Sequence, residues 1–325
     1  MTIRPAQQLP AFKQAPQRDS VAREERTQPF LDTPNEFVTL SNNEPKAKGS
    51  IAPENLRPGD QHETGLKGAL NAIGGFLGVA MTKAMRGMKA PMMTGAWKDL
   101  LVASYEVPKE ALQPYLPEGV ELDSWNGKHY MSLVALQCQD IKGLGFKVPG
   151  GGDFEQVNLR FYTKRETPEG EKKGVVFIKQ VVPSEVVAFA GKSLVNEAMI
   201  TAPMSHQRPQ GSAEGELSYT WDVDGKTSEM SAQRVGQARP LVEGSQEEFL
   251  LENYTGFSVQ RDGQTVEYDV EHPPWKTYQA ANPVIDVDAE GLYGKELAKY
   301  LSGPPMSVII VDGSKTAVHS PKPAA

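Results

Sequence analysis

Short runs in which apolar and polar residues alternate recur between residues 99 and 312. A period of two places the apolar side chains on one face of a strand, so each run predicts a half-buried β-strand. The predicted strands cover residues 99–107, 128–137, 154–163, 174–182, 216–223, 255–261, 265–270 and 306–312. Residue pairs that tolerate the positive φ of tight hairpin turns stand between several of these runs. They are Asn126-Gly127, Asp224-Gly225 and Asp262-Gly263. The sequence therefore predicts a largely antiparallel sheet.

Helical patterns are few in the same part of the chain. They cover residues 109–116, 185–195 after Ser184, a segment opened by the capping-box spacing of Ser245 and Glu248, and 295–303. Many strands with scattered helices are typical of a β-barrel or an α+β fold. The charged stretch 164–173 reads as an exposed hairpin loop.

The N-terminal part has a different pattern. Residues 1–64 are rich in polar residues and proline and have no sustained apolar period, which predicts a disordered leader. In residues 65–92 apolar side chains recur every three or four positions beside basic residues, which predicts an amphipathic helix. Such a helix could bind an anionic membrane surface, or it could pack on the strand domain or on a partner. Its glycines favour packing. We expect residues 316–325 to form a flexible tail.

Composition and charge narrow the function classes. The formal net charge of -7 argues against nucleic-acid binding, which needs a basic surface. The single cysteine, Cys138, excludes an intrachain disulfide and suits a reducing compartment. The chain begins without the apolar core of a secretory signal, and no stretch has the length of a membrane span. We therefore expect a cytoplasmic protein, and the oligomeric state stays open.

Several ordered sequence blocks resemble the YqjF-like family, which is related to the acetoacetate-decarboxylase-like superfamily. The blocks are residues 93–136 and the segments EQVNLRFY, GVVFI, GSQEEFLLENY, YDVEHPPW and LYG, which together span about residues 93–315. The resemblance implies an α+β, mainly β fold, in which a closed β-barrel with a few flanking helices surrounds an apolar cavity. It brings no settled activity with it.

In acetoacetate decarboxylases a lysine forms a Schiff base with a β-keto acid, and two adjacent lysines follow a helix. The resemblance places this passage at residues 185–204, where the sequence over residues 196–200 reads NEAMI. The lysine pair is absent. Lys172-Lys173, the one adjacent lysine pair after residue 95, stands in the predicted loop. Because an amine nucleophile needs burial or a neighbouring cation, we do not expect Schiff-base chemistry.

Candidate ligand contacts lie on the predicted strand 154–163. Alternation places Val157, Leu159 and Phe161 on one face. The opposite face carries Gln156, Asn158, Arg160 and Tyr162. If that face looks into a cavity, Arg160 can clamp a carboxylate, and if it looks outward Arg160 is a surface residue. The resemblance favours the cavity and places Lys98 where decarboxylases have a substrate-side arginine. The ligand-binding candidates are therefore Arg160, Lys98, Asn158 and Tyr162.

The catalytic candidate is Glu197, which could act as an acid or base if burial raised its pKa. It could equally pair with Lys192 or cap the backbone. His129, His206 and His272 show no metal-ligand spacing, and neither a nucleophile elbow nor a phosphate loop is present. We therefore expect no metal and no cofactor.

Three functional hypotheses remain. The leading one is a barrel that binds a small organic acid or acyl-like ligand in its cavity. The second is a lyase-like or hydrolase-like enzyme that acts on a keto acid with a carboxylate and Lys179 or Lys192. The third is a membrane-surface or partner-binding scaffold that docks through residues 65–90.

Overall fold

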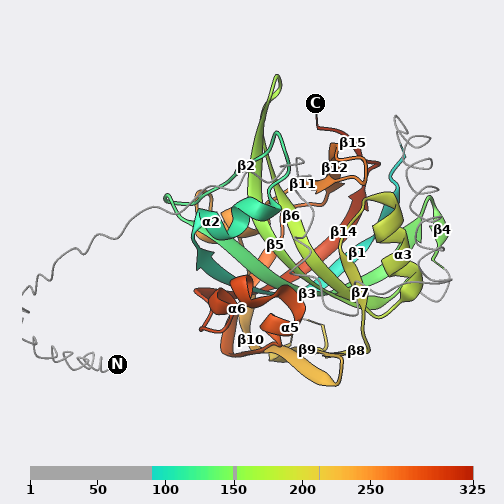
Figure 1. The fold of residues 1–325 in the computed structure, drawn as a ribbon. Coiled ribbons are helices and arrows are strands. Elements are labelled where there is room, and N and C mark those ends of the chain that lie inside the picture. Colours follow the sequence, from blue (N-terminus) through green and yellow to red (C-terminus); the bar gives the residue numbers. More distant parts are fainter. Residues whose placement is uncertain (1–89, 149–151, 212, 325) are drawn as a thin grey trace, which may run out of the picture. The chain divides into compact units, whose positions relative to one another are not determined.

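Strands dominate the part of the chain that a computed structural model describes, which is residues 90–148, 152–211 and 213–324 (Figure 1). The strands are β1 (Met93–Val107), β2 (Glu121–Leu122), β3 (His129–Gly143), β4 (Phe146–Lys147), β5 (Phe154–Thr167), β6 (Gly170–Val182), β7 (Met199–Thr201), β8 (Met204–Gln207), β9 (Gly215–Val223), β10 (Lys226–Pro240), β11 (Thr255–Val259), β12 (Thr265–Glu271), β13 (Lys276–Asp286), β14 (Ser307–Val318) and β15 (Lys322–Pro323). The helices are α2 (Lys109–Leu112), the 3-10 helix η3 (Gln113–Tyr115), α3 (Glu185–Leu194), α4 (Gln246–Leu251), α5 (Ala289–Tyr293) and α6 (Lys295–Leu301). The predicted leader and all but the last three residues of the predicted helix at 65–92 lie outside the described residues.

The strands form one sheet that meets itself. Its order is β15-β12-β11-β6-β5-β3-β1-β14-β13-β10-β9-β8, and β12 also pairs with β14. That extra pairing joins Val270 to Val318 and Glu271 to Ala317. Seven strands, β12, β11, β6, β5, β3, β1 and β14, therefore form a closed ring. The prediction of largely antiparallel pairing is confirmed, because only the β11–β6 and β6–β7 pairings are parallel among the described strands.

Both faces of the central strands are buried. On β5, Val157, Leu159 and Phe161 join a core that also contains residues of β9, β10, α5 and α6. Phe154 and Tyr162 join a second core, on the opposite face, with residues of α3 and α4. The alternation predicted for this strand is thus confirmed, and both sets of side chains leave water.

The part of the sheet beyond β14 turns back over the outside of the ring. His206 on β8 lies with Nδ1 2.6 Å from Oε1 of Glu155 on β5. The hydroxyl of Tyr219 on β9 donates to the carbonyl of Asp99 on β1 at 2.6 Å. Helices α5 and α6 pack on β6 and β1 respectively. This second layer covers the first core and leaves the inner face of the ring to the second core.

Local turn and cap chemistry agrees with the sequence. Asn126 and Gly127 have φ of 51° and 75°, and Asp224 and Gly225 repeat this pattern, as tight hairpin turns require. The Ser245 side chain accepts a hydrogen bond from the Glu248 backbone N–H, which begins α4 as its capping spacing predicts.

Two surface segments differ from expectation. The charged stretch 164–173 continues β5 and β6 as a long hairpin (Figure 1), because Arg165 and Lys172 both reach Glu267 on β12, at 2.8 and 2.7 Å. The tail predicted from residue 316 starts within β14, and β15 then pairs with β12. Both segments thus contact β12, a strand of the ring, the first through ion pairs and the second through strand pairing.

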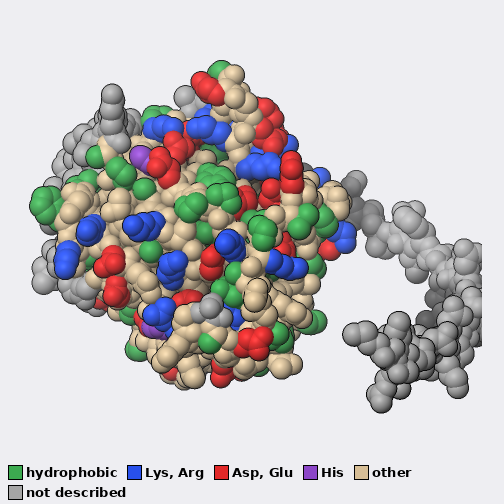
Figure 2. All heavy atoms as spheres, turned by 180° about the vertical axis from the view of Figure 1, so that it is seen from behind, with side chains coloured by type: hydrophobic (Ala, Val, Ile, Leu, Met, Phe, Trp, Pro, Cys, Tyr) green, Lys and Arg blue, Asp and Glu red, His purple; other side chains and the backbone are tan. Residues whose placement is uncertain are grey.

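The surface carries charges of both signs. On the face shown in Figure 2, basic and acidic side chains are interspersed. Within the described ranges, no helix combines the length and the apolar character that a membrane crossing requires.

Close contact between β14 and β1 yields a stability prediction. Gly313 has φ of +67°, and a Cβ there would lie 2.0 Å from the Trp97 carbonyl oxygen. We expect Gly313→Ala to lower the free energy of unfolding by about 1–3 kcal/mol from backbone strain alone. Gly303→Ala is the control, because nothing lies within 4 Å of its Cβ position, and it should change stability by less than about 0.5 kcal/mol. Urea denaturation measures both, and equal effects would contradict the close contact.

Candidate functional site

A cavity of about 240 Å³ lies on the inner face of the ring. All seven ring strands contribute residues to its wall, and α3 covers one side with Val187, Ala190 and Leu194. The wall is mostly apolar, with Trp97 and Phe177 as large members. A small, mostly apolar cavity with a few convergent polar groups is the usual form of a small-molecule site.

Arg160 on β5 is one of these polar groups. It lines the cavity, although only 8% of its surface is exposed. One Nη2 hydrogen bond reaches the Leu250 carbonyl at 3.2 Å, and the buried Nε has no partner. Arg160 forms no ion pair with any acidic side chain of the described chain. A buried guanidinium with unused donors is costly unless an anion joins it.

Glu197 enters the same cavity just beyond the end of α3. Asn196 takes a left-handed conformation, with φ of 52°, which turns the chain inward after the helix. The Asn196 side chain donates to the Val259 carbonyl at 2.7 Å, and Ser258 donates to the Val195 carbonyl at 2.8 Å. Two hydrogen bonds to β11 therefore hold the residues just before Glu197 in place.

The carboxyl group of Glu197 has neutral partners. The Tyr268 hydroxyl donates to Oε1 at 3.0 Å, and Nε2 of Gln180 donates to Oε2 at 3.2 Å. Burial raises the pKa of Glu197 to about 8, and the two donated hydrogen bonds reduce this rise. Neither Lys192 nor a backbone cap holds this group, since its hydrogen-bond partners are Tyr268 and Gln180.

Gln156 and, through it, Cys138 fix the orientation of Gln180. Nε2 of Gln156 on β5 donates to Oε1 of Gln180 at 2.6 Å. The Cys138 thiol on β3 donates in turn to Oε1 of Gln156 at 3.6 Å. Burial raises the pKa of Cys138, so its sulfur stays a thiol. A chain of polar contacts thus runs from β3 across β5 and β6 to Glu197.

An aromatic stack borders both the cavity and an open groove beside it. The His272 ring lies between Tyr254 and Trp275, with centroid distances of 4.6 and 4.0 Å. His272, Thr255 and Val270 line the cavity and the groove alike. Burial lowers the pKa of His272, and the charge of Arg160 lowers it further. The imidazole is therefore neutral at neutral pH.

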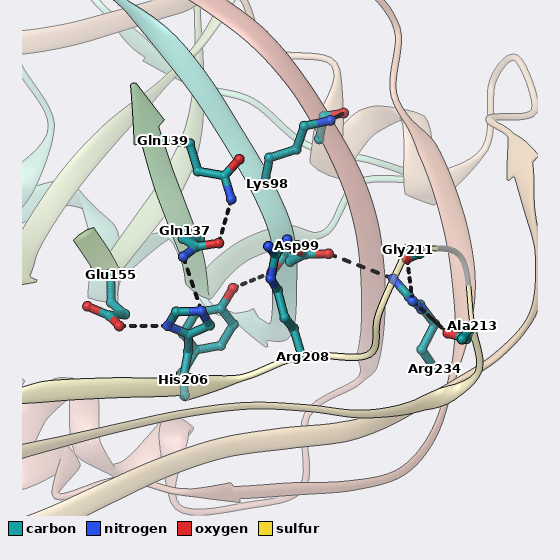
Figure 3. A network of polar contacts seen from close by, with 12 residues as sticks. Lys98, Asp99, Gln137, Gln139, Glu155, His206, Arg208, Gly211, Ala213 and Arg234 are labelled. Atoms are coloured by element: carbon teal, nitrogen blue, oxygen red, sulfur yellow. Dashed lines mark hydrogen bonds and ion pairs between the residues drawn. The ribbon is translucent and has the colours of Figure 1, made fainter. Parts of the chain in front are cut away.

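The other predicted ligand contacts lie elsewhere. Asn158 and Tyr162 are buried in the β5 strand but do not line the cavity, and the Tyr162 hydroxyl bonds to Ser132 at 2.6 Å. Lys98 follows cavity-lining Trp97 on β1 and points away, so that its Nζ donates to the Gly313 carbonyl at 3.1 Å (Figure 3).

Lys98 stands beside a polar network that joins the two layers (Figure 3). Asp99 pairs with Arg208 at 3.0 Å and with Arg234 at 3.7 Å. Arg234 also donates to the Gly211 and Ala213 carbonyls. None of these side chains lines the cavity, and their contacts hold β8 and β10 against the ring.

No lysine belongs to the described lining of the cavity, and Lys179 and Lys192 are not part of it. Of the three histidines considered, His272 alone lines it, and the described residues contain no cluster of metal-ligating side chains. Sequence reasoning did not select Gln180 or Tyr268. Tyr268 and Val270 alternate with Glu267 and Asp269 along β12, and this pattern is the signal that could have indicated the cavity face.

Comparisons with known proteins agree with this architecture. The sequence profile of DUF2071, described as an uncharacterized conserved protein, matches residues 94–315. The uncharacterized protein YqjF of Bacillus subtilis (strain 168) is 25% identical over 212 residues, which are 62% of this chain and 82% of that protein.

Solved structures share the fold. The enduracididine biosynthesis enzyme MppR complexed with pyruvate matches with a TM-score of 0.54 and 13% identity, over 74% of this chain and 92% of MppR. Acetoacetate decarboxylase from Legionella pneumophila matches with a TM-score of 0.50 and 15% identity, over 74% and 94% of the two chains. An acetoacetate decarboxylase-like enzyme from Sphingomonas wittichii RW1 matches with a TM-score of 0.51 and 12% identity, over 72% of this chain and 93% of that enzyme. At these identities the likeness establishes an acetoacetate decarboxylase-like, mainly β fold.

The raised pKa of Glu197 predicts how stability depends on pH. At pH values between 4.5, the ordinary pKa of this carboxyl group, and about 8, Glu197 holds a proton in the folded state and has released it in the unfolded state. The free energy of unfolding should therefore fall as pH rises through this window, by at most about 1.4 kcal/mol per pH unit from this group.

Glu197→Gln lacks this proton. Its stability relative to the wild type should rise from about pH 5 to about pH 8 and then level off, as urea denaturation can measure. Glu216→Gln, at an exposed position, is the control and should follow the wild type at every pH. A pH-independent difference between Glu197→Gln and the wild type would contradict the raised pKa.

Proposed function

The chain belongs to the DUF2071 family, and we propose that its cavity binds the carboxylate of a small organic acid at Arg160. The observation that carries the proposal is the environment of this arginine. It is buried in an apolar cavity, its Nε has no partner, and no carboxylate of the described chain pairs with it. A bound carboxylate would accept the unused donors in the bidentate geometry that guanidinium favours.

The size of the cavity limits the ligand. Drug-sized ligands occupy pockets of about 300–1,000 Å³, and this cavity holds about 240 Å³. A short-chain acid matches that volume and the apolar wall. Its carboxylate would contact Arg160, and its carbon chain would pack against residues such as Phe177.

The comparisons supply a parallel for a short acid. MppR, which shares the fold, was solved in complex with pyruvate. In our chain the described lining contains no lysine, so the proposal is binding without a Schiff base. The scaffold hypothesis concerns residues 65–90, which apart from residue 90 lie outside the described residues and stay a prediction.

A thermal-shift titration of the full chain tests the proposal. Butyrate, pyruvate and 2-oxobutyrate should raise the melting temperature, because a ligand that binds only the folded state stabilises it by mass action. Butyramide has nearly the same shape without the charge and should give no shift. Equal shifts with butyrate and butyramide would contradict a guanidinium contact.

Arg160→Met tests the same contact from the protein side. Methionine keeps much of the aliphatic volume and removes the buried charge, so the ligand-free variant should be at least as stable as the wild type. Its affinity for the acids should fall about 10- to 100-fold, because this change corresponds to the loss of one hydrogen bond to a charged group. Arg239→Met, at an exposed arginine paired with Glu247, is the matched control and should leave affinity unchanged. Unchanged affinity in Arg160→Met would overturn the proposal.

A further inference from the structure

We propose that Glu197 is a general base in this cavity, and that it removes a proton from the carbon beside the carbonyl group of a bound short 2-oxo acid. The inference rests on the proposed function, because the acid must first be held at Arg160. It adds an activity, carbon-proton exchange through an enolate, and it narrows the ligand class from organic acids to oxo acids.

The position and partners of Glu197 suit this role. Glu197 lines the cavity, and only 5% of its surface is exposed. Each oxygen receives one hydrogen bond, from Tyr268 and from Gln180, and no basic side chain of the described chain forms an ion pair with it. A carboxylate offers about four acceptor sites, so two remain for a proton from a ligand. An ion pair would have fixed the negative charge and weakened the base.

The pairing of β5 with β6 places Glu197 near the level of Arg160 in the cavity. Gln180, which bonds to it, pairs with Asn158 on β5, two residues from Arg160. Two residues span about 7 Å along a strand. A 2-oxo acid of three or four carbons whose carboxylate contacts Arg160 would extend its carbonyl and the next carbon toward Glu197.

The protonation equilibrium supports the same role. With a pKa of about 8, Glu197 is present in both protonation states near neutral pH. A general base works best when its pKa is close to the working pH, because both the ionised fraction and the proton affinity are then adequate.

The step balances without any co-reactant. Ionised Glu197 takes the proton from C3 of the acid, the C–H electron pair becomes the C2–C3 double bond, and the carbonyl pair moves to oxygen. Once Glu197 is protonated, the Tyr268 hydroxyl can turn its hydrogen bond to the enolate oxygen. Return of a proton to C3 regenerates the acid. In D₂O, Glu197 returns deuterium, and the groove shared at His272 gives a route for exchange with solvent.

Proton NMR of 2-oxobutyrate with the full chain in D₂O tests the inference. We expect the C3 methylene signal to disappear faster than in buffer alone. The rate should rise about tenfold per pH unit below the pKa of Glu197 and level above about pH 8, because the ionised form is active. Glu197→Gln should lower the exchange rate at least about 100-fold, which is the usual contribution of a general base.

Two further variants separate this role from a structural one. Tyr268→Phe removes a hydrogen bond that lowers the pKa of Glu197, so the pH profile should move to higher pH. Glu155→Gln changes a carboxyl group that pairs with His206 outside the cavity, and it should exchange like the wild type.

The outcomes distinguish the two proposals. If 2-oxobutyrate stabilises the wild type and Glu197→Gln alike and neither exchanges above buffer, the base is overturned and acid binding stands. If Glu197→Gln exchanges as fast as the wild type, the base is likewise overturned. If butyrate stabilises the wild type and no oxo acid does, the base is overturned and acid binding stands. If neither butyrate nor any oxo acid stabilises the wild type, both proposals fail.

Discussion

Two residue pairs between β12 and β14 close seven strands into a ring, and the cavity depends on that closure. The seam from β6 through β11 to β12 needs glycine at two positions. A Cβ on Gly174 would lie 2.3 Å from the Thr255 carbonyl oxygen, and a Cβ on Gly256 would lie 2.1 Å from Cζ of Tyr268. The first glycine lets β6 approach β11, where the pairing is a single parallel one. The second leaves room for the tyrosine ring that reaches Glu197.

The closed ring places a cation and an acid in one apolar space without pairing them. Arg160 and Glu197 both line the cavity, yet each is bonded to neutral groups of the described chain, a carbonyl for the first and a hydroxyl and an amide for the second. Buried charges are normally paired because desolvation is expensive. Burial raises the pKa of Glu197, which can thereby avoid its charge, whereas a guanidinium stays charged. The buried charge of Arg160 is therefore the one that still needs an anion beside it.

Sequence reasoning located most strands and caps but only part of the candidate site. The period of two on β5 placed Arg160 on the face opposite Val157, Leu159 and Phe161, because successive side chains of a strand point to opposite faces, and the resemblance favoured the cavity for that face. It did not find β10 or β13. Strand β10 reads as polar, and its buried Arg234 donates to the Gly211 and Ala213 carbonyls and pairs with Asp99, contacts that a sequence does not display. Lys98 was assigned by resemblance alone; it follows cavity-lining Trp97 on β1, so the alternation of the strand points its side chain away from the cavity.

A crystal structure of the full chain with 2-oxobutyrate would show whether Arg160 binds the acid. We expect the carboxylate on Arg160, with two oxygen atoms about 2.7–2.9 Å from guanidinium nitrogens, and the acid's carbon chain on the side of Glu197. A carboxylate bound elsewhere, with the Arg160 guanidinium still lacking an anion, would contradict it.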